Sequence, residues 1–396
     1  MLDIKGLIPI ISENNALNAA GQAMAELGVA GCIGTACVME GHLNSDMVQV
    51  LAKTSFSILL PMFLFSSLVK TIQTYGIKLS SVSIPIISAL HCYGMYLLSN
   101  NIILPTFQMN GKSSSGEVTS VVCSWGNSGV LPLIFAESLF RSQPSLLSKA
   151  YATISLYIVG WTPFFWSFAK SKIIKSQREV FPDSSNSSIT SSRSSSMSLK
   201  IKDKIAEVKS ILSPPVAGAM LGLAVGMSPL GQLLMNTSSK KAPLSFLYNS
   251  VQNLGRAASP ISLLVLTASL TLGASSKVEG VHDVSGCDEN GCMLQRLGCV
   301  CTARFIISPL LMLGMLTGLS KINIIGGKEI DPMLWFILLL ESAMPPAQNL
   351  VTMLHVADKK IEACDMAKFL FLVYVTSMLP VVFIVTMLLR SLNLIN

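Results

Sequence analysis

Residues 334–356 read LWFILLLESAMPPAQNLVTMLHV, an apolar stretch that is interrupted near its centre by Pro345 and Pro346. Each proline lacks a backbone N–H, and its ring clashes with the carbonyl of the preceding turn, so two in succession break an α-helix. The stretch has the length of a membrane-crossing helix, which needs roughly 20 mostly apolar residues. We therefore predict a transmembrane helix that is broken in mid-membrane, with Asn349 shortly after the break.

A second stretch of the same kind lies earlier in the chain. Residues 121–140 read VVCSWGNSGVLPLIFAESLF and carry Gly126, Asn127 and Pro132 within an apolar run. Glycine weakens a helix, and proline removes a backbone donor, so an interruption is predicted here too. Irregular backbone is tolerated at membrane depth only where it is buried in protein or lines a cavity. The two stretches together predict a site where two broken helices cross.

Outward from these segments, ten apolar stretches are long enough to cross a membrane. They lie at about 17–38, 47–69, 80–104, 118–140 and 149–170, and at about 211–235, 244–274, 298–320, 332–356 and 366–390. The two broken stretches are the fourth of each set of five, so they hold equivalent places. The sequence therefore predicts an all-α integral membrane protein of ten transmembrane helices, with broken fourth and ninth helices that cross at the midplane.

The chain divides at a serine-rich segment, SSNSSITSSRSSSMS, which has no apolar periodicity and could not bury a core. We predict a first five-helix repeat over residues 1–170, a linker over 171–208 and a second five-helix repeat over 209–396. Because five is an odd number, the second repeat enters the membrane from the opposite side, and the repeats are inverted.

Weak internal symmetry and the charge distribution support this division. Tyr157 stands six residues before Pro163, and Tyr374 stands six residues before Pro380. Nine Lys and Arg residues lie between positions 170 and 209. Because basic loops favour the cytoplasmic side, the linker is predicted to be cytoplasmic.

The composition excludes several other classes of protein. Hydrophobic residues make up 51% of the 396 residues, and charged residues make up only 12%, about half the roughly 25% of a soluble domain. The net charge of +7 is not gathered on a basic face interleaved with aromatics, so no nucleic acid is expected as a partner. The cysteines near position 290 do not have metal-site spacing. No nucleophile paired with a base and no HExxH motif is found, so neither a cofactor nor enzymatic activity is expected.

The predicted crossing has the chemistry of an anion site. The N-terminus of a half-helix presents free N–H groups and about half a positive charge, and asparagine amides donate hydrogen bonds without carrying a charge. Such a site suits a carboxylate. The competing interpretation is that the prolines only kink packed helices and that the asparagines bond neighbouring backbone. The candidate substrate-binding residues are Asn127, Gly126, Pro132, Pro345, Pro346 and Asn349.

Three ionisable residues within the apolar stretches are further candidates, because charges inside a membrane are usually functional. Glu137 and Glu341 lie in the two broken stretches, and either could carry a coupling proton; simple solvation is the alternative for Glu137. Arg304, in the eighth stretch, could neutralise a substrate carboxylate, pair with a glutamate or extend to the membrane surface.

At these residues the sequence resembles the auxin efflux carrier superfamily, and within it the PIN-LIKES branch. The resemblance rests on GNSGVLPLIF at 126–135, SPPVAGAMLGLAVGMSPL at 213–230, RFIISPLLMLG at 304–314 and ESAMPPAQNLVTM at 341–353. It implies ten helices in two inverted repeats with proline-broken fourth and ninth helices beside the substrate site. It further implies auxin, an indole carboxylate, or a related weak organic acid as cargo, and the endoplasmic reticulum as location.

The functional hypothesis is therefore a membrane carrier for auxin or a related organic anion that works by alternating access. An ion-coupled symporter or antiporter and a non-transporting receptor on a carrier scaffold remain open. The expected partners are a small organic anion and the lipid bilayer, with a homodimer as one open assembly. The plasma membrane and other endomembranes remain alternatives to the endoplasmic reticulum.

Overall fold

The structure is a computed structural model. It describes residues 8–76, 79–111, 113–169, 171–173, 213–235, 242–275, 289–356 and 360–394. Within these ranges every regular element is a helix, and the one β-type pairing is an isolated bridge between Gly126 and Pro346. The described chain is therefore all-α, as its apolar composition predicts. Almost all of the serine-rich segment lies outside the described residues.

The helices up to residue 169 follow the first five predicted stretches. They are α1 (Ile8–Met39), α2 (Ser45–Thr54), η2 (Ser55–Leu59), α3 (Leu60–Tyr75), α4 (Leu79–Leu98), η3 (Ser99–Ile103), α5 (Leu104–Thr106), α6 (Ser114–Ser124), α7 (Val130–Phe140), α8 (Pro144–Phe164) and η4 (Phe165–Ala169). The segments η2, η3 and η4 are π-helical turns, each beside a proline. A proline lacks the backbone N–H that the regular helix needs, and a wider π-helical turn lets the neighbouring backbone adjust to that missing hydrogen bond.

The described helices from residue 214 onward begin with α11, near the start of the sixth predicted stretch. They are α11 (Pro214–Met227), α12 (Pro229–Leu234), α13 (Ser245–Arg256), α14 (Ala258–Ser275), α15 (Glu289–Thr302), η5 (Ala303–Ile307), α16 (Ser308–Lys321), α17 (Pro332–Ser342), α18 (Asn349–Val356) and α19 (Lys360–Ser391). Here too one π-helical turn, η5, directly precedes a helix whose second residue is a proline, Pro309.

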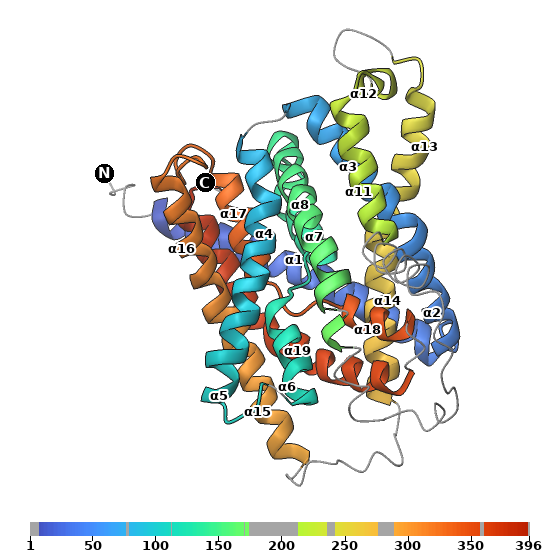
Figure 1. The fold of residues 1–396 in the computed structure, drawn as a ribbon, viewed down its shortest axis with the longest axis vertical. Coiled ribbons are helices and arrows are strands. Elements are labelled where there is room, and N and C mark those ends of the chain that lie inside the picture. The colour runs from blue at the N-terminus through green and yellow to red at the C-terminus, as the bar shows by residue number, and fades with distance from the viewer. Residues whose placement is uncertain are drawn as a thin grey trace, which may run out of the picture.

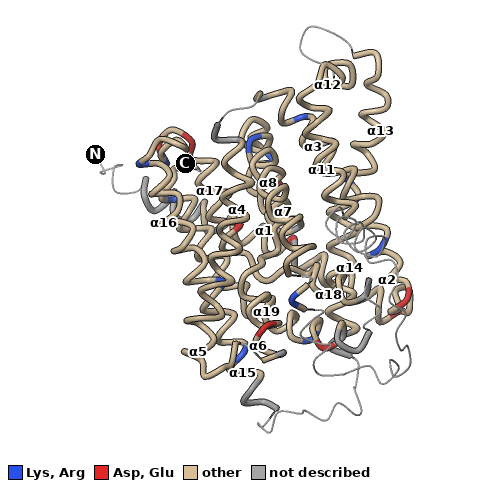
Figure 2. Tube along the Cα trace, viewed as in Figure 1, with Lys and Arg blue, Asp and Glu red and all other residues tan. Residues whose placement is uncertain are grey.

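Among the described residues, six helical spans are long and apolar enough to cross a membrane, against ten in the sequence prediction. They are Ala16–Met39, Ser45–Thr74, Val82–Thr106, Ser245–Leu272, Met293–Lys321 and Asp365–Ser391. Three further apolar helices, Leu131–Phe140, Pro214–Met227 and Pro332–Ser342, are shorter. They are short because their stretches are divided, as where Ser228 ends α11 before Pro229. This content of apolar helix identifies an integral membrane protein, and Figure 2 shows the charged residues gathered mostly toward helix ends.

The helices pack in two groups, which lie side by side in Figure 1. In one group α3 packs against α11 and α13, and α14 packs against α2. In the other, α8 packs against α4 and α17, and α16 against α17. Helix α1 contacts α14 of the first group and α7 and α19 of the second. The groups meet along α1 and α19, where a cavity lies, and also where α8 contacts α3 and α11.

Glycines allow close helix contact in the first group. A Cβ atom on Gly218 would collide with the backbone of Pro61, and one on Gly222 would come within 2.9 Å of the backbone of Phe65. A Cβ on Gly34 would collide with the Thr267 side chain. Small residues are the usual means by which membrane helices approach each other. Gly31 differs, because a Cβ there would meet only Thr267 Cγ2, at 3.9 Å.

Gly218→Val is expected to destabilise the protein, because added methyl groups would force α11 away from the α3 backbone. Overpacking of this kind costs about 1–3 kcal/mol, and a melting curve of the detergent-solubilised protein measures the loss. Gly314→Val is the matched control, since a Cβ on Gly314 in α16 meets nothing within 4 Å. Equal melting temperatures for the two variants would contradict the close α11–α3 contact.

Candidate functional site

The two helix breaks are joined by backbone hydrogen bonds. Helix α6 ends at Ser124 and α7 begins at Val130, while α17 ends at Ser342 and α18 begins at Asn349. Between these ends the two extended segments run antiparallel, paired at the bridge between residues 126 and 346. The breaks that prolines predict from sequence are therefore in direct contact in the fold.

The prolines determine which backbone groups pair. The amide of Asn127 donates to the carbonyl of Pro345 at 2.7 Å, and the amide of Ala347 donates to the carbonyl of Trp125 at 2.9 Å. Pro345 and Pro346 have no N–H, so Ala347 carries the first amide available after them. The pairing satisfies buried polar groups that neither broken helix could satisfy alone.

The side chain of Asn127 links the breaks to α19. It is buried, and its amide nitrogen donates to the hydroxyl of Tyr374 at 2.8 Å. That hydroxyl in turn donates to the carbonyl of Pro346 at 2.9 Å. Sequence reasoning missed Tyr374 as a site residue, although the symmetric placement of Tyr157 and Tyr374 before prolines was a signal that could have found it.

The start of α7 carries backbone amides without acceptors. Pro132 is the third residue of α7, so the break precedes it. The N–H groups of Ser128, Gly129 and Leu131 donate no hydrogen bond to any described part of the chain, whereas the amide of Leu133 donates to the carbonyl of Gly129 at 3.4 Å. Three free amides at a helix N-terminus form a site with the polarity that an anion requires.

The start of α18 differs from that of α7. The amide of Leu350 donates to Ala347 at 3.2 Å, and the amide of Val351 donates to Gln348 at 2.9 Å. The half-buried Asn349 lines a cavity of about 20 Å³ together with Ser262 and Gln348, and does not line the cavity at α1 and α19. Asn127 and Asn349 are therefore not brought to one common surface, and the two halves of the site are unequal.

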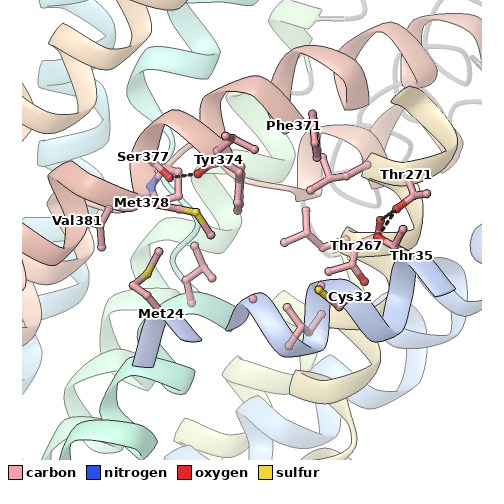
Figure 3. A pocket seen from close by; sticks show the side chains of 18 of the residues that line it. Met24, Cys32, Thr35, Thr267, Thr271, Phe371, Tyr374, Ser377, Met378 and Val381 are labelled. Atoms are coloured by element: carbon pink, nitrogen blue, oxygen red, sulfur yellow. Dashed lines mark hydrogen bonds between the residues drawn. The ribbon is translucent and has the colours of Figure 1, made fainter. Parts of the chain in front are cut away.

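A large cavity of about 420 Å³ lies beside the start of α7. Figure 3 shows it between α1, which contributes Met24 and Cys32, and α19, which contributes Phe371, Tyr374 and Met378. Its wall is mostly apolar. The residues from the broken helices that line it are Leu131, Phe135 and Pro345, and its polar groups include Thr35, Thr267 and Thr271.

The three ionisable candidates take different places. Glu137 is exposed. Arg304 is buried, and it donates to the carbonyls of Ser124, Glu341 and Met344 rather than reaching the membrane surface. Glu341 is buried near the hydroxyl of Ser128, and neither of its carboxylate oxygens has a hydrogen-bond partner within the described ranges. None of the three lines the large cavity.

A chain of buried polar side chains, formed by Ser308, His91 and Tyr157, leads up to Arg304. The hydroxyl of Ser308 lies 3.4 Å from Arg304 Nη1 and donates to the carbonyl of Ser342 at 2.7 Å. The ring nitrogen Nε2 of His91 lies 3.2 Å from the same hydroxyl, and Nδ1 lies 3.5 Å from the hydroxyl of Tyr157. These contacts tie α4, α8 and α16 to the end of α17, so the crossing is fixed on several helices at once.

Broken helices that cross beside an apolar cavity, in an all-helical chain with several membrane-spanning helices, define a membrane transport protein. A family model described as "Membrane transport protein" matches residues 21–385, and the chain belongs to this family, the auxin efflux carrier family.

The curated relatives that the chain matches are PIN-LIKES proteins of Arabidopsis thaliana. It is 23% identical to PIN-LIKES 7 over 362 residues, which is 82% of this chain and 85% of that protein. It is 23% identical to PIN-LIKES 1 over 358 residues, or 83% of this chain and 70% of that protein. It is 31% identical to PIN-LIKES 2 over 140 residues, which is 35% of this chain but only 27% of that protein.

Proposed function

We propose that this protein carries auxin, indole-3-acetate, or a related weak organic anion across a membrane by alternating access. The observation that carries the proposal is the set of free amides at Ser128, Gly129 and Leu131, at the start of α7 where Leu131 borders the apolar cavity. The amides suit a carboxylate, and the cavity suits an apolar ring. Membership of the auxin efflux carrier family and the likeness to PIN-LIKES proteins support the same cargo.

The size and lining of the cavity support a small aromatic acid. Its volume of about 420 Å³ falls at the lower end of the roughly 300–1,000 Å³ of small-molecule sites. Met24, Phe371 and Met378 offer apolar surface for a ring. No lysine or arginine lines this cavity, so binding relies on backbone amides and on the helix dipole to hold the negative charge.

For the architecture we propose ten transmembrane helices in two inverted repeats, over residues 1–170 and 209–396, joined by a cytoplasmic linker over 171–208. The broken elements α6/α7 and α17/α18 take the fourth and ninth positions. The first packing group, with α1, serves as the scaffold, and the second serves as the moving bundle. Because the cavity lies where the groups meet, movement of one against the other would expose it to each side in turn.

An ion-coupled symporter or antiporter is the second candidate, and Glu341 is the observation that favours it. A buried carboxylate without a hydrogen-bond partner is costly unless it is neutralised, so a proton taken up there could accompany the anion. Glu341→Gln separates the two candidates. If the carrier is a uniporter, uptake does not respond to an imposed proton gradient in the wild type or in the variant. If Glu341 carries the proton, wild-type uptake responds to the gradient and Glu341→Gln abolishes that response.

For localisation we propose the endoplasmic reticulum, by resemblance to the PIN-LIKES branch. The predicted linker of 171–208 is short, which supports this branch. The plasma membrane and other endomembranes are the alternatives, and imaging of the tagged full-length chain with organelle markers distinguishes them. A homodimer is an open assembly that size measurement in detergent tests.

Purified protein in liposomes is expected to accumulate labelled indole-3-acetate when an interior-positive potential is imposed. A potential of 100 mV acts on one charge with about 2.3 kcal/mol, which corresponds to a limiting accumulation of about 50-fold. A panel of small carboxylates measured with and without the potential defines the cargo. Saturable binding without flux would favour a receptor, and neither binding nor flux of any carboxylate would contradict the proposal.

A further inference from the structure

Arg304 is buried among the described helices, and each of its three guanidinium nitrogens donates a hydrogen bond. Its side chain is buried, with a relative exposure of 1%. Nε donates to the carbonyl of Met344 at 2.8 Å, Nη1 donates to the carbonyl of Ser124 at 3.4 Å, and Nη2 donates to the carbonyl of Glu341 at 3.4 Å. One guanidinium thus joins backbone oxygens of both broken spans.

These three carbonyls lie at or just after the C-terminal ends of the broken helices α6 and α17. Ser124 is the last residue of α6, Glu341 is in the last turn of α17, and Met344 lies in the break after it. The C-terminus of a helix leaves carbonyls without partners and carries about half a negative charge. In carriers with broken helices, half-helix C-termini and unwound carbonyls are the groups that coordinate the coupling cation. Here the guanidinium occupies them.

Two neighbouring features indicate that this arrangement is built in. A Cβ atom on Gly126 would collide with the guanidinium, so glycine at this position makes room for Arg304. The carboxylate of Glu341 accepts nothing from Arg304; only the backbone carbonyl of that residue does. The guanidinium is therefore matched to the carbonyls of the break rather than to an acidic side chain.

The local helix geometry also directs Arg304 inward. It lies in η5, a π-helical turn that precedes Pro309. Pro309 cannot donate to the turn before it, and the wider turn absorbs that loss. The hydroxyl of Ser308, bound to the carbonyl of Ser342, lies 3.4 Å from Nη1 and supports the guanidinium from the same helix.

We propose that the guanidinium of Arg304 is a resident cation of the crossing, held by the carbonyls of Ser124, Glu341 and Met344 where a metal cation would otherwise bind, so that the protein moves its anion without sodium or potassium. Its role is positioning: it holds two negative half-helix ends together and does not touch the cargo. The statement about transport rests on the proposed function, whereas the statement about the cation site does not.

The site is tested in the purified full-length protein by thermal unfolding. Arg304→Ala leaves the buried carbonyls of Ser124 and Met344 without donors, at about 1–3 kcal/mol each, while the carbonyl of Glu341 keeps the amide of Met344, so its melting temperature is expected to fall by several degrees. Guanidinium chloride on the order of 10 mM should raise the melting temperature of this variant by mass action, and urea at the same concentration should not. Neither the wild type nor Arg296→Ala should respond. Arg296 is the matched control because it is a neighbouring arginine that stacks over Phe369, with 4.2 Å between its guanidinium carbon and the ring centroid.

Arg304→Lys is the second variant, and it keeps the proposal testable if Arg304→Ala does not fold. Lysine keeps the charge but lacks the planar fork of donors. The melting temperature of Arg304→Lys should therefore lie between those of the wild type and Arg304→Ala. Guanidinium chloride should raise it by less than it raises that of Arg304→Ala. A melting temperature of Arg304→Lys equal to that of the wild type, or an equal response of all variants to guanidinium and urea, would overturn the assignment.

Uptake of labelled indole-3-acetate into liposomes tests the transport part. Wild-type flux is expected to be the same in sodium, potassium and N-methylglucamine buffers. A sodium stimulation of about fivefold or more, the lower end of ordinary coupling between sites, would overturn cation independence. If the wild type moves no carboxylate in any buffer while guanidinium still stabilises Arg304→Ala, the proposed function fails and the resident cation stands.

Discussion

Asn127→Ala is expected to lower indole-3-acetate flux about 10- to 100-fold while the protein stays folded. The variant removes the donor to Tyr374, and with it the 2.8 Å bond between the first break and α19. A buried hydrogen bond lost on one side costs about 1–3 kcal/mol, and 1.4 kcal/mol is about tenfold. The loss falls on the segment that carries the free amides of Ser128, Gly129 and Leu131.

The fold should survive this change because the backbone pairing does not depend on the side chain. The amide of Asn127 still donates to Pro345, and the amide of Ala347 still donates to Trp125. Initial uptake rates at several concentrations of indole-3-acetate, with a melting curve of each variant, separate loss of function from loss of structure. Normal uptake by Asn127→Ala would remove the assigned site.

Asn349→Ala is the matched control, and its effect is expected to be smaller. The sequence alone predicts equal losses, since both asparagines stand at the break of their span, in equivalent spans. In the fold Asn349 lines the small cavity with Ser262 and Gln348, away from the large one. Equal losses for both variants would mean that the cargo contacts both half-helices, and that the binding surface includes the start of α18.

The location of the breaks could be predicted from sequence because proline acts locally. Pro345 and Pro346 remove two successive donors whatever surrounds them, and α17 ends at Ser342 just before them. The pairing of the breaks, by contrast, joins residues far apart in sequence. Only the equivalent positions of the two spans pointed to it, through the expectation of inverted repeats.

The role of Arg304 could not be predicted from sequence, since an arginine in an apolar stretch has several outcomes. It can extend to the surface, pair with an acid or face a ligand, and the residues around it in the chain do not distinguish these. Its actual acceptors are backbone carbonyls, which every residue carries and no sequence pattern marks. The sequence also does not show that Gly126 leaves space for Arg304, because these two residues meet only in the folded structure.

The glycines of the first helix show the same limit. In the sequence, Gly31 and Gly34 are equally suited to close helix contact, since neither carries a side chain. Only Gly34 is in such contact, with Thr267, whereas Gly31 lines the large cavity. Three residues separate them, nearly one turn, but the small difference in angle decides which of the two faces the neighbouring helix.

Gly31→Phe is accordingly expected to lower the rate of indole-3-acetate transport about 10- to 100-fold without unfolding the protein. A Cβ on Gly31 meets only Thr267 Cγ2, at 3.9 Å, so the backbone can accept a side chain there. The ring would enter the 420 Å³ cavity and take the space that the cargo needs. Displacing a packed ring costs about 1–3 kcal/mol, the range measured for overpacked sites.

Gly21→Phe on the same helix is the control, because a Cβ there meets nothing within 4 Å and Gly21 does not line the cavity. It should transport at the wild-type rate with an unchanged melting temperature. Competition between indole-3-acetate and smaller carboxylates sharpens the test, since a partly filled cavity should still admit an acid without a ring. If Gly31→Phe transports indole-3-acetate normally, the cargo does not pass between α1 and α19, and the cavity beside Tyr374 is not its route.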